Sequence, residues 1–209
     1  MNAVIISVAI LFFLLFLYLL KQSKQPTGLV GIWMMKIWNQ VYFPMVEWAI
    51  SQLEQQNIKN ILDVGIGNGQ STLYLKQYFP NSKVIGIDIS KTAITQAKKW
   101  NIADLNFELK DVGQTTYSAE SFDLITAFQT HFHWPDLSRA FSELRRILRR
   151  DGLILLACEW SKLTYFQPEL KKEEEFAAFL NNKGLKLVSS QRKNQWILYK
   201  IIKKPEGVI

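Results

Sequence analysis

Apolar runs alternate with helical patterns over most of the chain, from about residue 60 to residue 203. Seven short runs predict strands: residues 61–64, 83–89, 105–109, 122–128, 153–158, 185–189 and 196–202. Apolar side chains at helical spacing predict helices over residues 91–100 and 137–149. A stretch without Gly or Pro predicts a helix that begins at residue 70, and an acidic and basic stretch predicts another over residues 168–181. Strands that alternate with helices in this way predict an α/β fold with a doubly wound, mainly parallel sheet.

An uncharged apolar run, residues 3–20, precedes the alternating region. As a helix it would rise about 27 Å, close to the hydrocarbon thickness of a bilayer. A cleaved signal peptide and a buried helix of a soluble protein are the alternatives, but no Lys or Arg precedes the run and no small-x-small cleavage site follows it. Lys21, Lys24 and Lys36 lie after the run, so we expect a single-pass membrane anchor with the rest of the chain in the cytoplasm.

Residues 28–56 are rich in Trp and Met, and Pro44 predicts that they divide into two helices. Four apolar residues at helical spacing predict packing on the sheet: Val46, Ala49, Ile50 and Leu53. Two other roles stay open for this segment. One is a lid over a ligand pocket, and the other is contact with the membrane surface through the side chains of Ile32, Trp33, Ile37 and Trp38.

Composition narrows the class of protein without naming a partner. The length of 209 residues leaves room for one domain of ordinary size, and the net charge of +7 implies attraction to anionic surfaces. Cys158 is the only cysteine, so an intrachain disulfide and a Cys-based metal cluster are both excluded. No arginine- or aromatic-rich RNA module lies outside the alternating region, so we expect no nucleic-acid partner.

Three glycines follow the first predicted strand directly. Gly65, Gly67 and Gly69 are spaced two apart after Asp63. Glycine lets a ligand approach the backbone and tolerates positive φ, and a strand–turn–helix unit places the ligand at the carboxyl end of the strand. Asp88 ends the next predicted strand 19 residues after Gly69, the distance at which a carboxylate on the adjacent strand meets ribose hydroxyls. The pattern therefore predicts a nucleoside site.

The pattern D-x-G-x-G-x-G, with Asp88 beyond it, resembles motifs I and II of class I S-adenosylmethionine (SAM) methyltransferases. The dinucleotide fingerprint G-x-G-x-x-G differs, because it requires glycine where this chain has Gln70. Residues 122–159 resemble a later sequence motif of the same family, F-D-h-h, a loop and then R-h-L-+-x-G-G-x-h-h, where h is a hydrophobic and + a basic residue. In this chain Asp151-Gly152 replaces the usual Gly-Gly or Pro-Gly pair. The resemblance covers residues 60–203 and implies a Rossmann-like seven-stranded sheet whose last strand is antiparallel.

The resemblance also implies SAM as the cofactor. In such proteins the acid at the end of the third strand and the amide after it contact adenine, which here means Asp111 and Val112; a turn-forming Asp is the alternative. The residues expected to bind the cofactor are Asp63, Gly65, Gly67, Gly69, Asp88, Ile89, Asp111, Val112 and Gln129.

Both histidines of the chain, His131 and His133, lie in the loop after the fourth predicted strand, where the acceptor should sit. With a pKa near neutral, either could take a proton from a hydroxyl or an amine. A hydrogen-bonded loop histidine is the alternative, and two histidines without an evident third ligand do not indicate a metal site. Residues 129–132 also lack the Asn/Asp-Pro-Pro-Tyr/Phe tetrapeptide of enzymes that methylate amino groups of nucleic acids.

We therefore expect a membrane-anchored SAM-dependent methyltransferase that acts on a small-molecule or lipid-like acceptor. Residues 1–25 would form the anchor and its basic flank, residues 26–58 a helical cap, and residues 59–209 the methyltransferase domain. An NAD(P)-dependent oxidoreductase on a similar fold is one alternative, disfavoured by Gln70. A catalytically silent SAM-binding membrane protein is another, because intact cofactor residues do not demonstrate turnover. The acceptor and the oligomeric state do not follow from the sequence.

Overall fold

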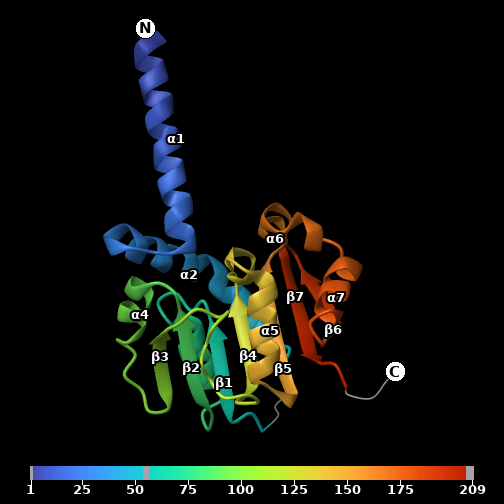
Figure 1. The fold of residues 1–209 in the computed structure, drawn as a ribbon. Helices are drawn as coiled ribbons and strands as arrows, with labels where there is room; N and C mark the ends of the chain where they lie inside the picture. The colour runs from blue at the N-terminus through green and yellow to red at the C-terminus, as the bar shows by residue number, and fades with distance from the viewer. Residues whose placement is uncertain (1, 54–56, 206–209) are drawn as a thin grey trace.

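The computed structural model describes residues 2–53 and 57–205 of the chain. Within these residues a seven-stranded sheet has the order β3-β2-β1-β4-β5-β7-β6 (Figure 1). The strands are β1 (Asn60–Val64), β2 (Lys83–Asp88), β3 (Leu105–Leu109), β4 (Phe122–Phe128), β5 (Leu148–Glu159), β6 (Leu185–Lys193) and β7 (Trp196–Lys203). β1 to β5 pair in parallel, whereas β7 is antiparallel to both β5 and β6. The predicted Rossmann-like sheet with an antiparallel last strand is therefore confirmed.

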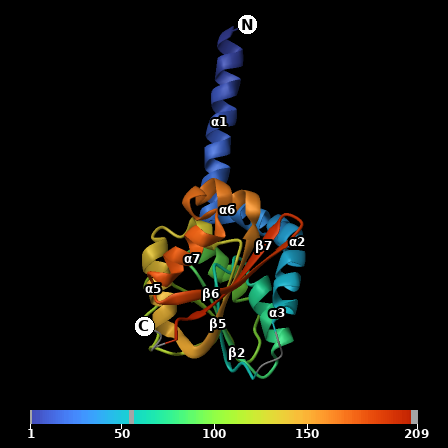
Figure 2. The same ribbon diagram turned by 90° about the vertical axis from the view of Figure 1, so that its right-hand side faces the viewer.

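Helices cover both faces of the sheet, as the views in Figures 1 and 2 show. One face packs against α2 (Gly28–Ser51), α3 (Gln70–Tyr78) and α4 (Lys91–Ala97), and the other against α5 (Leu137–Ile147), α6 (Trp160–Phe166) and α7 (Glu173–Asn181). β1 shows why two cores form: Ile61 packs into the first, whereas Leu62 and Val64 belong to the second. A strand buried on both faces carries apolar residues almost continuously, which explains the runs in the sequence.

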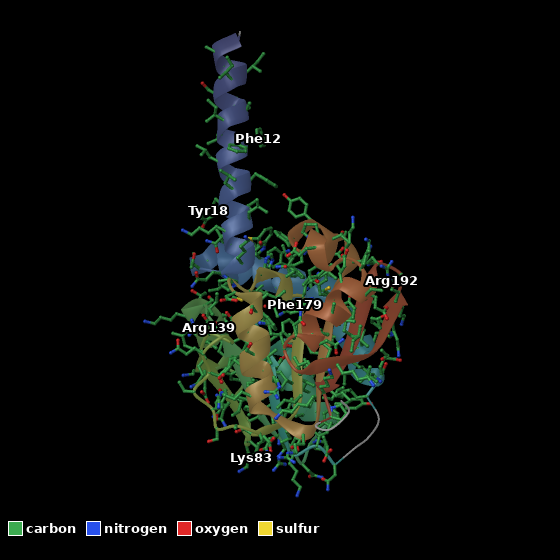
Figure 3. All side chains as sticks on the ribbon, turned by 45° about the vertical axis from the view of Figure 1, so that its right-hand side comes forward. Phe12, Tyr18, Lys83, Arg139, Phe179 and Arg192 are labelled. Carbon is green, nitrogen blue, oxygen red and sulfur yellow. The ribbon has the colours of Figure 1, made fainter. Side chains whose placement is uncertain are left out.

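α1 (Asn2–Lys24) projects away from this domain (Figures 1 and 2). Its large apolar side chains from Val4 to Tyr18 are 44–68% exposed, and Figure 3 shows Phe12 and Tyr18 on the projecting part. In the described residues α1 is the one helix whose length and apolar composition would allow it to cross a membrane, and none of its apolar window is buried. Signal sequences share this length and composition, so the membrane anchor stays a prediction.

The chain turns between α1 and α2 through an elbow, residues 22–31, that is held by specific contacts. The side chain of Gln22 is buried, donates from Nε2 to Thr27 Oγ1 at 2.7 Å, and accepts from the Thr27 amide at 2.7 Å. The Pro26 carbonyl accepts a hydrogen bond from Ser90 Oγ just after β2. A Cβ on Gly31 would lie 2.8 Å from the Pro26 carbonyl carbon, so the close approach of the two segments requires glycine. The elbow therefore fixes α1 on the domain.

α2 is one helix, so the predicted division at Pro44 is wrong. Proline removes one helical hydrogen bond, to the carbonyl four residues earlier, and Gln40 at that position is exposed to water. Met35 before the proline and Met45 after it are both buried. Packing on both sides of Pro44 therefore keeps the helix continuous.

Several other elements differ from the predicted ones. α5 ends at Ile147 rather than at residue 149, because Leu148 is extended and pairs with Phe122 as the first residue of β5. The predicted helix over residues 168–181 is divided into the 3₁₀ turn η2 (Pro168–Leu170) and α7. Three glutamates occupy the first turn of α7, where the helix dipole favours negative charge. α6 follows β5 directly and was not predicted.

Candidate functional site

A cavity of about 560 Å³ lies between α2, the carboxyl ends of the parallel strands and the last turns of α1. Figure 3 gives the orientation: Lys83, the first residue of β2, lies at the end of the domain away from α1. The opposite, carboxyl edge of the sheet therefore faces the α1 side. Gly65 and Gly67 line the cavity, together with Asp88 at the end of β2 and with Gln129 and His133 after β4.

The glycine turn after β1 has the backbone conformation that the sequence predicts. Gly65, Gly67 and Gly69 have φ values of 73°, 56° and 82°. A Cβ on Gly65 would lie 2.1 Å from Thr130 Oγ1, so the turn packs directly on the loop after β4. At Gly67 the nearest atom to such a Cβ is Met35 Sδ, 3.7 Å away. The backbone at Gly67 is therefore open to the cavity, whereas Gly69 is the N-cap residue of α3.

Asp88 is a buried carboxylate at the wall of this cavity. Its Oδ2 accepts from the Gly67 amide at 3.0 Å and its Oδ1 from the Ser90 amide at 2.8 Å. Burial raises the pKa of Asp88, and the bonds from the amides of Ser90, Gly67 and Ile89 oppose that rise. Each carboxylate oxygen has a second lone pair, so Asp88 can also accept from the hydroxyls of a ribose.

Asp63 lies beneath the turn rather than at the cavity, and is 1% exposed. Its two oxygens accept hydrogen bonds from the hydroxyls of Ser71 at 2.7 Å, Thr72 at 2.9 Å and Thr126 at 2.8 Å. Burial raises the pKa of Asp63 to about 6 in spite of these three bonds. The arrangement ties β1, α3 and β4 together, so Asp63 holds the turn in place.

The other residues expected at the cofactor lie at the same sheet edge but beside the cavity. Ile89 is 41% exposed, and its carbonyl accepts from Gln25 Nε2 at 3.3 Å. Asp111 is exposed and accepts a hydrogen bond from the Gly113 amide at 2.8 Å, as a turn-forming Asp would. Val112 is buried.

Gln129 lines the cavity and bridges β4 to β5. It has a φ of 59°, its Oε1 accepts from the Glu159 amide at 2.8 Å, and its Nε2 donates to Glu159 Oε2 at 3.3 Å. These contacts fix the start of the loop that carries both histidines, the 3₁₀ turn η1 (His131–His133).

The two histidines have different surroundings, and the near-neutral pKa expected for them is wrong. Burial lowers the pKa of His131 to about 3, helped by His133. His131 is 3% exposed, lies on the core side of the loop and has its Nε2 3.8 Å from Cys158 Sγ. His133 faces the cavity, and burial lowers its pKa to about 4 with help from the positive charges of Lys24 and Lys162. Both side chains are therefore neutral at pH 7, and His133 is the one that lines the cavity.

The low pKa of His131 predicts a loss of stability in acid. The unfolded chain binds a proton on this side chain near pH 6.5, whereas the folded chain does so only near pH 3, so stability falls as the pH falls between these values. His131→Gln removes the effect. We expect the wild-type free energy of unfolding to drop by about 2.5 kcal/mol more than that of the variant between pH 7 and 4.5.

Urea unfolding of both full-length proteins in detergent, followed by circular dichroism, measures this difference. Asp63 and His133 titrate in both proteins, so their contributions cancel in the comparison. Equal losses of unfolding free energy in the two proteins would show that His131 does not stay neutral in the folded state.

Several cavity residues were not predicted from the sequence. Tyr42 of α2 donates to Glu159 Oε2 at 3.0 Å and accepts from Lys162 Nζ at 2.6 Å. Asn39 donates from Nδ2 to Asn68 Oδ1 in the glycine turn, which closes α2 over that turn. One feature of the sequence could have indicated those on α2, because Met35, Asn39, Tyr42 and Val46 lie three or four residues apart and so share one face of a helix. Lys162 lies on α6, which had no such pattern.

The cavity fits a nucleoside cofactor at the end formed by Gly67 and Asp88. The open backbone at Gly67 admits a ligand at close range, and the Asp88 carboxylate suits a ribose diol. SAM carries such a ribose diol, and it supplies an electrophilic methyl carbon when it is bound. In the described residues no group of three His, Cys, Asp or Glu side chains could hold a metal ion.

The central part of the chain matches known methyltransferases. Residues 62–156 match a family described as "Methyltransferase domain". An uncharacterized methyltransferase, YcgJ of Bacillus subtilis, is 27% identical over 125 residues, which cover 58% of this chain and 46% of that protein. Malonyl-[acyl-carrier protein] O-methyltransferase 1 of Ilyobacter polytropus is 32% identical over 149 residues, covering 63% and 54%.

The chain thus spans about half the length of these curated relatives. A SAM-dependent methyltransferase structure from Aquifex aeolicus superposes with a TM-score of 0.64 at 14% identity, covering 75% of this chain and 88% of that one, which shows the same fold. The matched region contains the glycine turn, Asp88 and the loop after β4. Residues 62–156 therefore match a methyltransferase domain, and the comparisons together support a class I SAM-dependent methyltransferase.

Proposed function

We propose that the protein is a membrane-anchored enzyme that transfers a methyl group from SAM to a small-molecule acceptor. One observation carries this proposal: a single cavity joins the nucleoside end at Gly67 and Asp88 to a second region lined by His133 and Lys162. A transferase needs donor and acceptor side by side, and this cavity offers space for both. Gln70, directly after the glycine turn, and the match of residues 62–156 to a methyltransferase family leave the nicotinamide alternative without support.

Methyl transfer from a sulfonium is an in-line displacement. Bound SAM would supply the methyl carbon to a lone pair of the acceptor, and the electron pair of the broken carbon–sulfur bond would stay on sulfur as a thioether. The protein must hold the two reactants at near-attack distance and exclude water. If the acceptor atom carries a proton, the neutral imidazole of His133 at the cavity wall can accept it. The Ilyobacter relative is named as an O-methyltransferase, which supports an oxygen acceptor.

The anchor is part of the proposal. α1 exposes its apolar side chains on all sides and ends at Lys21 and Lys24, which favours a cytoplasmic position for the domain. A SAM-dependent enzyme also requires the compartment in which SAM is made. Retention of the full-length chain in carbonate-washed membranes would support the anchor, whereas a shortened, soluble protein would indicate a cleaved signal.

Calorimetric titration of the full-length protein in detergent with SAM, S-adenosylhomocysteine and NAD tests the cofactor. We expect micromolar binding of the first two and none of NAD, because Asp88 suits a ribose diol and Gln70 breaks the dinucleotide fingerprint. Binding of NAD alone would overturn the proposal. A sample that binds SAM but yields no methylated product from membrane extracts would indicate a silent SAM-binding protein.

A further inference from the structure

The cavity extends from the cofactor end to the helix that we propose enters the bilayer. Besides Asp88, its lining includes Phe16, Leu19 and Leu20 of α1. Phe16 is 56% exposed and Leu19 36% exposed, so the same side chains that face the cavity lie at the surface of the molecule. A ligand in this space therefore touches both the methyltransferase domain and the last apolar turns of the anchor.

The wall between these two ends is apolar. Met34, Met35, Trp38 and Phe43 of α2 line it. Thioether and aromatic side chains adapt to hydrocarbon chains of varied shape, and they offer few polar partners to a compact polar substrate. This part of the cavity suits the chain of an amphiphile.

Two positive charges line the cavity near His133. Lys162 Nζ is 4.5 Å from the ring centroid of Tyr42 and 3.7 Å from Glu159 Oε2, and Lys24 Nζ is 5.6 Å from the ring centroid of Phe166. Both lysines line the cavity. Among the described lining residues Asp88 is the one carboxylate, and it already accepts two backbone amides at the far end. Glu159 offsets part of the charge of Lys162, and the two lysines together leave this part of the cavity positive, which favours an anionic group.

The outer surface near the cavity suits the headgroup region of a membrane. α1, the first half of α2 and α6 gather at one end of the domain (Figure 1). Exposed large side chains occur on the last two of these helices: Leu29 at 86%, Trp33 at 65% and Tyr165 at 75%. Aromatic side chains with a polar atom are favoured where hydrocarbon meets water. With α1 in a bilayer, this end of the domain would lie against the membrane surface.

We propose that the acceptor is an anionic amphiphile that enters the cavity from the bilayer. Its chain rests against Phe16, Leu19 and Trp38, and its head lies between Lys24 and Lys162 with the reacting atom toward the cofactor end. An anionic oxygen of the head forms the bond to the methyl carbon, the carbon–sulfur bond breaks with its electron pair left on sulfur, and no proton has to be removed. This inference rests on the proposed function, since it names the substrate class of the same site.

Photolabelling of the full-length protein in phosphatidylcholine nanodiscs tests the inference. The probe is palmitic acid with a mid-chain diazirine, added with SAM, and adducts are mapped by mass spectrometry. We expect adducts on Met35 or Trp38 in the cavity, beyond those on lipid-exposed positions such as Phe12. Hexadecanol with the same diazirine carries no charge and should label the cavity about tenfold less, as for loss of one charged contact. Lys162→Gln should reduce labelling by the acid to a similar extent.

A pair of variants on α1 provides the matched control. Leu19→Trp places a larger side chain at a cavity position and should abolish cavity labelling, whereas Leu17→Trp changes a residue that does not line the cavity and should leave it unchanged. SAM binding by calorimetry is measured on every sample. Adducts confined to exposed α1 positions, or equal labelling by acid and alcohol, with SAM binding intact would overturn this inference alone. Loss of SAM binding in the wild-type protein would instead contradict the proposed function.

Discussion

Replacement of Gly65 by alanine is expected to disrupt the glycine turn and abolish measurable SAM binding. The new Cβ would lie 2.1 Å from Thr130 Oγ1, and the φ of 73° disfavours any residue with a Cβ. Overpacking and left-handed strain together cost about 2–5 kcal/mol. Calorimetry with SAM and urea unfolding of the same sample would measure both effects. Wild-type affinity in Gly65→Ala would contradict the geometry of the turn.

Two further variants separate the clash from the backbone strain. Thr130→Gly removes every atom that the new Cβ would meet within 2.7 Å, so the double variant Gly65→Ala/Thr130→Gly should recover the overpacking part of the lost stability. Gly67→Ala is the matched control in the same turn, because it has a positive φ of 56° but its Cβ would meet no atom closer than 3.7 Å. Its loss of unfolding free energy should be the smaller one, about 1–2 kcal/mol.

Asp88→Ala is expected to weaken SAM binding by about 1.5–3 kcal/mol, or roughly 10- to 150-fold, as for loss of a charged hydrogen bond. The variant also releases the Gly67 amide, which is part of the same turn. Asp88→Asn retains one acceptor oxygen and should bind SAM with intermediate affinity.

The control for this series is Asp151→Ala. Asp151 is an exposed acid near the start of β5, seven residues before Cys158 at the carboxyl end of that strand. Its replacement changes the net charge of the protein by the same amount as Asp88→Ala without altering the cavity. Calorimetry should give wild-type affinity for this variant. If Asp88→Ala also binds SAM as the wild type does, Asp88 does not hold the ribose.

The sequence predicted the parts of the site that depend on local pattern. Parallel strands place their carboxyl ends at one edge, so the positions of Gly65, Gly67 and Asp88 followed from spacing alone. Positive φ at the three glycines followed from their lack of a Cβ. These features depend on a few consecutive residues, which is why they could be predicted.

The features that escaped prediction depend on tertiary packing. The pKa of His131 is set by burial, which no loop sequence reveals, and the cavity contact of Lys162 depends on α6, a short helix without clear periodicity. Pro44 did not end α2, because buried residues on both sides outweigh the loss of one hydrogen bond. In each case the surroundings outweighed the local signal.

The elbow between α1 and α2 has a consequence for how the enzyme meets its substrate. A flexible tether would let the domain tumble, but the paired Gln22–Thr27 bonds and the contact of Pro26 with Ser90 hold the domain at one angle to α1. With α1 in a bilayer as proposed, enzyme and amphiphile diffuse laterally in one plane and meet in a constant mutual orientation. Turnover would then follow the mole fraction of acceptor in the membrane, and dilution with inert lipid would slow it even at a constant bulk concentration.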